Sequence, residues 1–212
     1  YTRALEMLYN AIGDVTGSQV IVDPSKNAGY AYILSMLPGI DLYILHLVRD
    51  PRATAYSWLR KKVGLRREKP VKSVLEWSVR NMVAEGIGHI SPKRYQRLRY
   101  EDFVKRPVET SKRILDFLEK PNLDLPFVSD HEAALGVNHT IYGNPNRFHS
   151  GLVKIKLDDA WQTIRKTDKA IIVALTWPFL FQYGYPIMVR RHTRSHDAHE
   201  FNEISADHEQ IN

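Results

Sequence analysis

The fold is decided by residues 42–58, LYILHLVRDPRATAYSW. The stretch from Leu42 to Val48 is almost entirely apolar and rich in β-forming residues, which predicts a central strand covered on both faces. Asp50 and Pro51 then predict the start of a helix, because Asp is a preferred N-cap and proline suits the first helical position. A strand that leads directly into a helix is typical of a parallel α/β sheet.

The rest of the chain continues this alternation. We expect short strands at Gln19–Val22 and Tyr95–Tyr100, and a loop-rich stretch from Leu123 to Gly151. The apolar periodicity and the breakers predict helices over Thr2–Ile12, Ala28–Leu37, Asp50–Lys62, Ser73–Ile87, Pro107–Leu118 and Lys169–Tyr183. The predicted fold class is therefore α/β, with a largely parallel sheet flanked by helices.

The composition is that of one globular domain. The chain has 212 residues, of which 43% are hydrophobic and 25% charged. There is no apolar run of roughly 18 residues and no signal-peptide pattern, so we expect a cytoplasmic protein without membrane contact. The absence of cysteine excludes disulfides and cysteine zinc sites. We predict one domain over residues 1–187 and a polar, disordered tail over residues 188–212. The oligomeric state is left open.

The net charge of +6 suggests an anionic partner, and the basic residues are concentrated between Arg49 and Lys72. Such a cluster raises the local concentration of anions. One alternative is a solvated basic helix face, and another is a module that binds nucleic acid or another polyanion through residues 60–72. We expect no nucleic-acid partner, because this patch lacks the interleaved aromatic residues that stack on bases.

The end of the predicted central strand is a candidate anion site. Ligands of open α/β sheets bind at the carboxyl edge of the strands, which is where Arg49 lies. The first N–H groups of the following helix would face the same place. Arg49 has a guanidinium suited to bidentate phosphate binding, and Ser57 offers a hydroxyl about two turns along the helix. Alternatively, Arg49 pairs with a neighbouring acid and Ser57 only occupies a helix surface.

Four motifs in order resemble the sulfotransferases that use 3'-phosphoadenosine 5'-phosphosulfate (PAPS). Arg49-Asp50-Pro51-Arg52-Ala53 followed by Ser57 resembles their 3'-phosphate-binding segment. The preceding stretch, VDPSKN to LVRDPR, is similar to the same region of bacterial and tyrosylprotein-type sulfotransferases. LRYEDF at 98–103 with Pro107, and GNPNRF at 143–148, resemble two later elements. The resemblance covers residues 19–185.

This resemblance implies a role for particular residues. Arg49 and Ser57 would hold the 3'-phosphate, with Arg147 as a further ligand, and Tyr100 would lie against the adenine. Lys26 would be the catalytic residue, neutralising charge on the leaving 5'-phosphate. The alternative for Lys26 is a solvated lysine at a helix start, and the alternative for Tyr100 is a core tyrosine. PAPS would be the co-substrate, with no metal, and the acceptor a hydroxyl or amine on a small molecule, glycan or peptide.

The chain departs from the family at its start. A complete member opens with a strand, a phosphate loop rich in Gly, Ser and Thr, and a helix, and no such segment is found here. We therefore predict an N-terminally truncated P-loop-like sulfotransferase fold that lacks the first strand and phosphate loop and is inactive alone. A P-loop kinase of related fold stays an alternative, because the absent loop would be the Walker A segment. No general base is identified: His46, in mid-strand, is expected to be a core histidine, and His139 and His149 are weak candidates.

Overall fold

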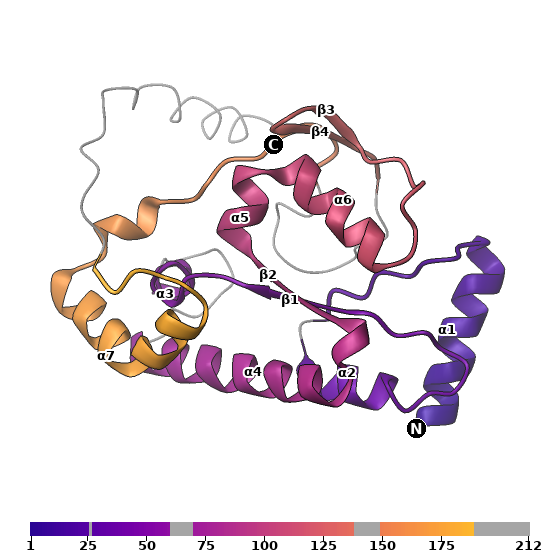
Figure 1. Ribbon diagram of the computed structural model, residues 1–212, viewed down its shortest axis with the longest axis horizontal. Helices are drawn as coiled ribbons and strands as arrows, with labels where there is room; N and C mark the ends of the chain where they lie inside the picture. Colours follow the sequence, from indigo (N-terminus) through magenta and orange to yellow (C-terminus); the bar gives the residue numbers. More distant parts are fainter. Residues whose placement is uncertain (26, 60–69, 138–148, 189–212) are drawn as a thin grey trace, which may run out of the picture.

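The computed structural model describes residues 1–25, 27–59, 70–137 and 149–188 (Figure 1). Its elements, in chain order, are α1 Thr2–Thr16, α2 Ala28–Leu34, β1 Ile44–Val48, α3 Pro51–Leu59, α4 Pro70–Ile90, η1 Pro92–Arg94, β2 Tyr95–Arg99, α5 Tyr100–Lys105, α6 Pro107–Phe117, β3 Phe127–Ser129, β4 Glu132–Leu135, β5 Gly151–Lys154, η3 Ala160–Thr163 and α7 Lys166–Gln182. Over the first half, each of the two strands, β1 and β2, is preceded and followed by helices, but one predicted strand is missing.

Two parallel strands, β1 and β2, lie at the centre of the fold (Figure 1). They pair in register from Ile44 opposite Tyr95 to Val48 opposite Arg99. Their carboxyl ends therefore lie side by side, and the chain leaves them into α3 and α5. The strands β3, β4 and β5 form a separate antiparallel sheet in that order. The parallel pair with its helices confirms the predicted α/β class.

The core lies between β1 and the helices α3, α4 and α7. One cluster joins Val48 of β1 to Trp77 of α4 and Leu180 of α7. A second cluster joins α3, α4, η3 and α7 through Ala55, Val74, Ile164 and Ile172. Burial of one large apolar side chain is worth about 1.5–3 kcal/mol. These clusters hold α3, and with it the β1–α3 junction, against α4 and α7.

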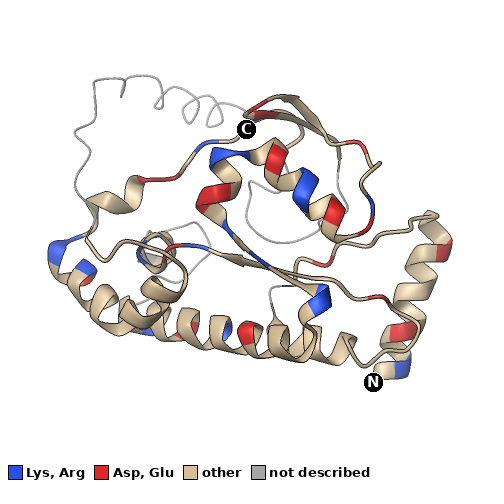
Figure 2. Cartoon of the chain, in the orientation of Figure 1, with Lys and Arg blue, Asp and Glu red and all other residues tan. Residues whose placement is uncertain are grey.

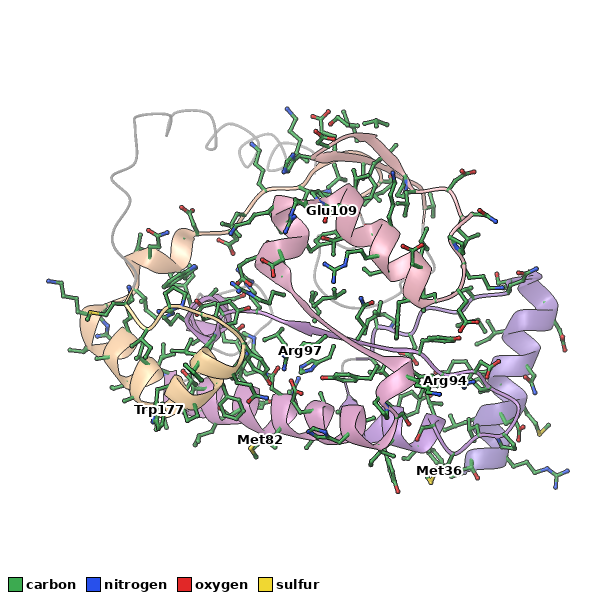
Figure 3. The ribbon with its side chains drawn as sticks, viewed as in Figure 1. Met36, Met82, Arg94, Arg97, Glu109 and Trp177 are labelled. Atoms are coloured by element: carbon green, nitrogen blue, oxygen red, sulfur yellow. The ribbon has the colours of Figure 1, made fainter. Side chains whose placement is uncertain are left out.

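The outer sides of α4 and α7 are apolar and exposed. Met82 of α4 and Trp177 of α7 project away from the strands (Figure 3), with exposed fractions of 54% and 59%. In the part of the chain that the structure describes, no helix combines the length and apolar character required to cross a membrane.

Only one face of the central strand β1 is buried, whereas the sequence predicted that both faces would be. His46 and Val48 are buried, whereas Leu45 and Leu47 are 41% and 56% exposed. Successive side chains of a strand point to opposite faces, so one face of β1 packs against the helices and the other stays open. The expectation of a strand covered on both faces was therefore wrong.

The predicted strand at Gln19–Val22 was also wrong. This segment has no regular secondary structure, and its three apolar residues, Val20, Ile21 and Val22, are exposed. An apolar run does not form a strand by itself, because all of its ladder hydrogen bonds are made to another strand. The preceding helix α1 runs four residues past its predicted end, until Gly17 adopts the left-handed conformation, φ 64°, that ends many helices.

The stretch from Leu123 to Gly151 is more ordered than predicted. It contains β3 and β4, and β5 begins at its last residue. Glu132 of β4 pairs with Lys154 and Leu135 pairs with Gly151. In the sequence, β4 and β5 are separated by residues 136–150, which are too many for a short hairpin turn, so the sequence lacks the local signal that predicts such pairs.

Candidate functional site

The candidate site lies where β1 and β2 end. Arg49 follows β1, and Tyr100 opens α5 directly after β2. The guanidinium carbon of Arg49 lies 4.8 Å from the centre of the Tyr100 ring. Basic and acidic residues follow one another closely where β1 runs into α3 and β2 into α5 (Figure 2). The parallel register thus brings together two of the predicted site residues, which are far apart in the sequence.

The start of α3 is built on a buried ion pair. Asp50 caps the helix as predicted, because its Oδ1 accepts a hydrogen bond of 2.8 Å from the Arg52 N–H. The Arg52 side chain is fully buried and binds both carboxylate oxygens, with Nε at 2.9 Å from Oδ1 and Nη2 at 2.6 Å from Oδ2. Its Nη1 donates to the Ile187 carbonyl at 3.2 Å, and Trp161 covers its face at 4.9 Å. A buried charge requires such partners.

The sequence reasoning missed this role of Arg52. It counted Arg52 among the basic residues of the segment 49–72 and within the motif at 49–53, and gave it no role of its own. The available signal was its position two residues after an N-cap Asp, from which an arginine can fold back on the carboxylate. Arg52 is therefore a structural residue of the site and not part of an exposed basic surface.

Glu101 ties the two strand ends together. Its Oε1 accepts from the Asp50 N–H at 3.1 Å, and its Oε2 accepts from the Tyr185 hydroxyl at 2.7 Å. Burial, reinforced by Glu101, raises the pKa of Tyr185, so the phenol keeps its proton and donates. The N–H groups of Asp50 and Arg52 are thus bound by carboxylates of the chain. The expectation that the first N–H groups of α3 face a bound anion stays a prediction.

Two nitrogens of the Arg49 guanidinium differ in their pairing. Its Nη2 donates to Asp158 Oδ2 at 3.0 Å, which is the neighbouring acid that the sequence left open. Its Nε is buried and has no hydrogen-bond partner within the described residues. An acceptor with two suitably spaced oxygens would satisfy both donors of this edge.

Arg99 is a further arginine at the end of the parallel strands. It ends β2, lies over the Tyr185 ring at 4.4 Å and donates from Nη1 to the Gly184 carbonyl at 3.1 Å. Its buried Nε has no hydrogen-bond partner in the described part of the chain, with Asp102 3.7 Å away. The sequence reasoning missed Arg99 too, because its proximity to Tyr185 arises only in the folded chain.

The roles of the other predicted residues stay predictions. Ser57 is partly buried on α3, about 9 Å along the helix axis from Pro51 at 1.5 Å per residue. Its role as a phosphate ligand stays a prediction. Lys26 and Arg147 lie outside the described residues, as do the basic stretch 60–69 and His139, and so does the tail from residue 189.

His46 belongs to the core and not to the site. Asn81 donates from Nδ2 to the Trp77 carbonyl, so its Oδ1 accepts from His46 Nε2 at 2.8 Å. His46 Nδ1 then accepts from the Tyr95 hydroxyl at 2.5 Å. Burial lowers the pKa of His46 and keeps it neutral. Both ring nitrogens are engaged, as expected of a core histidine.

An acidic and a basic residue complete this network. Glu85 lies 3.7 Å from His46 Nδ1 and 3.0 Å from Arg97 Nη1. Arg97 is labelled between β2 and α4 in Figure 3, and it lies over the Tyr183 ring at 5.1 Å. The network joins β1, β2, α4 and α7 on the helix-covered side of the strands. Within the described residues, no group of His, Asp and Glu is arranged to hold a metal ion.

Comparison with known proteins agrees with this architecture. Residues 3–124, more than half of the chain, match the Sulfotransferase family. Among solved structures, the sulfotransferase domain from the curacin biosynthetic pathway has a similar fold, with a TM-score of 0.58 and 22% sequence identity. The match covers 85% of this chain and 68% of that one. The comparison with curated proteins gave no match. The residues matched, together with the parallel strands and their helices, show that the chain belongs to the sulfotransferase family.

Proposed function

We propose that this sulfotransferase uses PAPS as the sulfuryl donor and a hydroxyl or amine as the acceptor. The family supports sulfuryl transfer in general. The observation that carries the choice of donor is the Arg49 guanidinium on Tyr100, at the ends of two parallel strands, with a buried Nε that has no hydrogen-bond partner among the described residues. This is where α/β sheets bind nucleotides, and an arginine edge is suited to a terminal phosphate.

In this proposal, the 3'-phosphate of the nucleotide binds the Nε edge of Arg49. Tyr100 supports the guanidinium through its ring and lies against the adenine. Ser57 and Arg147 add ligands to the same phosphate. The 3'-phosphate distinguishes PAPS from ordinary adenine nucleotides, so these residues would select the donor.

The chemistry would be an in-line displacement at sulfur. A lone pair of the acceptor oxygen or nitrogen forms a bond to sulfur while the bond from sulfur to the 5'-phosphate oxygen breaks. The acceptor loses a proton, and adenosine 3',5'-bisphosphate leaves. Lys26 would neutralise the charge that grows on the leaving phosphate, as a fixed cation stabilises such a transition state. The acceptor would be a small molecule, a glycan or a peptide.

The test is a calorimetric titration of the 212-residue chain with adenosine 3',5'-bisphosphate and with AMP. We expect the bisphosphate to bind more tightly. Arg49→Ala should weaken bisphosphate binding roughly 10- to 150-fold, the worth of about 1.5–3 kcal/mol for a charged hydrogen bond, and change AMP binding little. Arg106→Ala, at an arginine that is 66% exposed, is the control and should change neither. Equal affinity for both ligands, or equal losses in Arg49→Ala, would rule out a 3'-phosphate site.

Two further ligands separate the alternative functions. A polyanion-binding module would bind single-stranded DNA more tightly than either nucleotide, and a P-loop kinase would bind ADP at least as tightly as the bisphosphate.

A further inference from the structure

Asp158 meets Arg49 from a distant part of the chain. It lies between β5 and η3, 109 positions after Arg49. Its Oδ2 accepts from Arg49 Nη2 at 3.0 Å, and its Oδ1 accepts from the Ala160 N–H at 3.3 Å. Each carboxylate oxygen thus has its own donor, one on the guanidinium and one at the start of η3.

This contact uses only half of an edge of Arg49. The N–H groups of Nε and Nη2 form one edge of the planar guanidinium. An acceptor with two oxygens can bind both donors of such an edge. Asp158 takes Nη2 alone, because its other oxygen is engaged with Ala160. Nε is left buried and without a partner in the described structure, which makes this edge an incompletely satisfied site.

We propose that Asp158 is a counterion that a terminal phosphate must displace from Arg49, and that it thereby lowers the affinity for that phosphate. The proposal rests on the proposed function, in which that phosphate is the 3'-phosphate of the nucleotide. A phosphate monoester carries a charge of about −1.5 to −2 at neutral pH and three acceptor oxygens. A phosphate therefore brings more negative charge and more acceptor oxygens to Nε and Nη2 than the single Asp158 oxygen does. An anion with less charge and fewer oxygens would leave the ion pair intact.

The contact has an energetic consequence for the nucleotide. A ligand with a 3'-phosphate loses part of its binding energy to breaking the ion pair and to repulsion from Asp158, and a ligand without it loses nothing. The side chains of Arg49 and Asp158 are 26% and 41% exposed, so the effect is moderate. Asp158 therefore weakens the binding of adenosine 3',5'-bisphosphate and leaves the binding of AMP unchanged.

The experiment measures binding of adenosine 3',5'-bisphosphate and of AMP to Asp158→Asn. Asn keeps an oxygen that accepts from the Ala160 N–H, so the local fold is retained, and Asp158→Ser shares this property as a second variant. Both should bind the bisphosphate about 3- to 10-fold more tightly than the unmodified chain, with AMP affinity unchanged. Asp159→Asn removes the same charge one residue further on and should change the affinity for the bisphosphate less than about 2-fold.

Coupling to Arg49 distinguishes a direct contact from a general field. In an Arg49→Ala background, Asp158→Asn should no longer give the full gain, because no ion pair is left to break. The inference is overturned if Asp158→Asn and Asp158→Ser bind the bisphosphate no more tightly, or if Asp159→Asn gains as much. If the unmodified chain does not prefer the bisphosphate to AMP, the proposed 3'-phosphate site itself fails, which is a separate result.

Discussion

Replacing Arg52 with methionine removes one partner of a fully buried ion pair and keeps a side chain of similar length. The Asp50 carboxylate would then be a buried charge without its cation, because Asp50 is only 4% exposed. Breaking a buried pair in this way costs about 3–5 kcal/mol of unfolding free energy. Arg106→Met breaks the exposed pair with Glu109 and should cost no more than about 1 kcal/mol.

A double variant tests the cause. In Asp50→Asn/Arg52→Met the buried charge is gone, and Asn still caps α3. The double variant should therefore be more stable than Arg52→Met by about 1–3 kcal/mol. Urea unfolding at pH 7, followed by far-ultraviolet circular dichroism and tryptophan fluorescence, measures all four proteins. The reasoning is refuted if Arg52→Met loses no more than Arg106→Met, or if the double variant is the less stable of the two.

Two more predictions concern α4 and the network around His46. Gly88→Ala should lower the unfolding free energy by about 1–3 kcal/mol, because its Cβ would lie 2.7 Å from the Tyr95 ring. Gly86→Ala has open space around its Cβ and should raise the unfolding free energy by about 0.5–1 kcal/mol. Thermal or urea unfolding measures both, and equal effects of the two substitutions would contradict this reasoning. Because burial lowers the pKa of folded His46, the unfolded chain takes up the proton first, so stability should be complete above about pH 6.5 and fall as the pH drops below it. Urea unfolding between pH 8 and 5 should show a smaller fall in His46→Gln, and an identical fall would assign the pH dependence to other groups.

The junction from β1 to α3 was predicted well because its signals are local. A β-prone apolar run, an N-cap Asp and a proline at the first helical position act within a few residues of backbone. The structure confirms the strand, the Asp50 cap and a helix that begins at Pro51. These signals did not predict that Arg49 and Tyr100 meet: the resemblance assigned both to the nucleotide, and the parallel pairing of β1 and β2 brings them together.

Other predictions failed where the deciding contacts are distant. Val20, Ile21 and Val22 form no strand, because a strand depends on a neighbour that its own sequence does not contain. Leu45 and Leu47 are exposed, because only the folded chain decides which face of β1 the helices cover.

By itself, the sequence determined the α/β class, the strand-to-helix junction and the family resemblance, since these depend on residues close together in the chain. Only the tertiary structure decided the state of the charges at the site. Arg52 is buried on Asp50 beneath Trp161, and Arg49 pairs with Asp158. Whether an arginine is free or paired depends on which acids and rings folding places beside it, and for Arg49 the acid comes from 109 positions away.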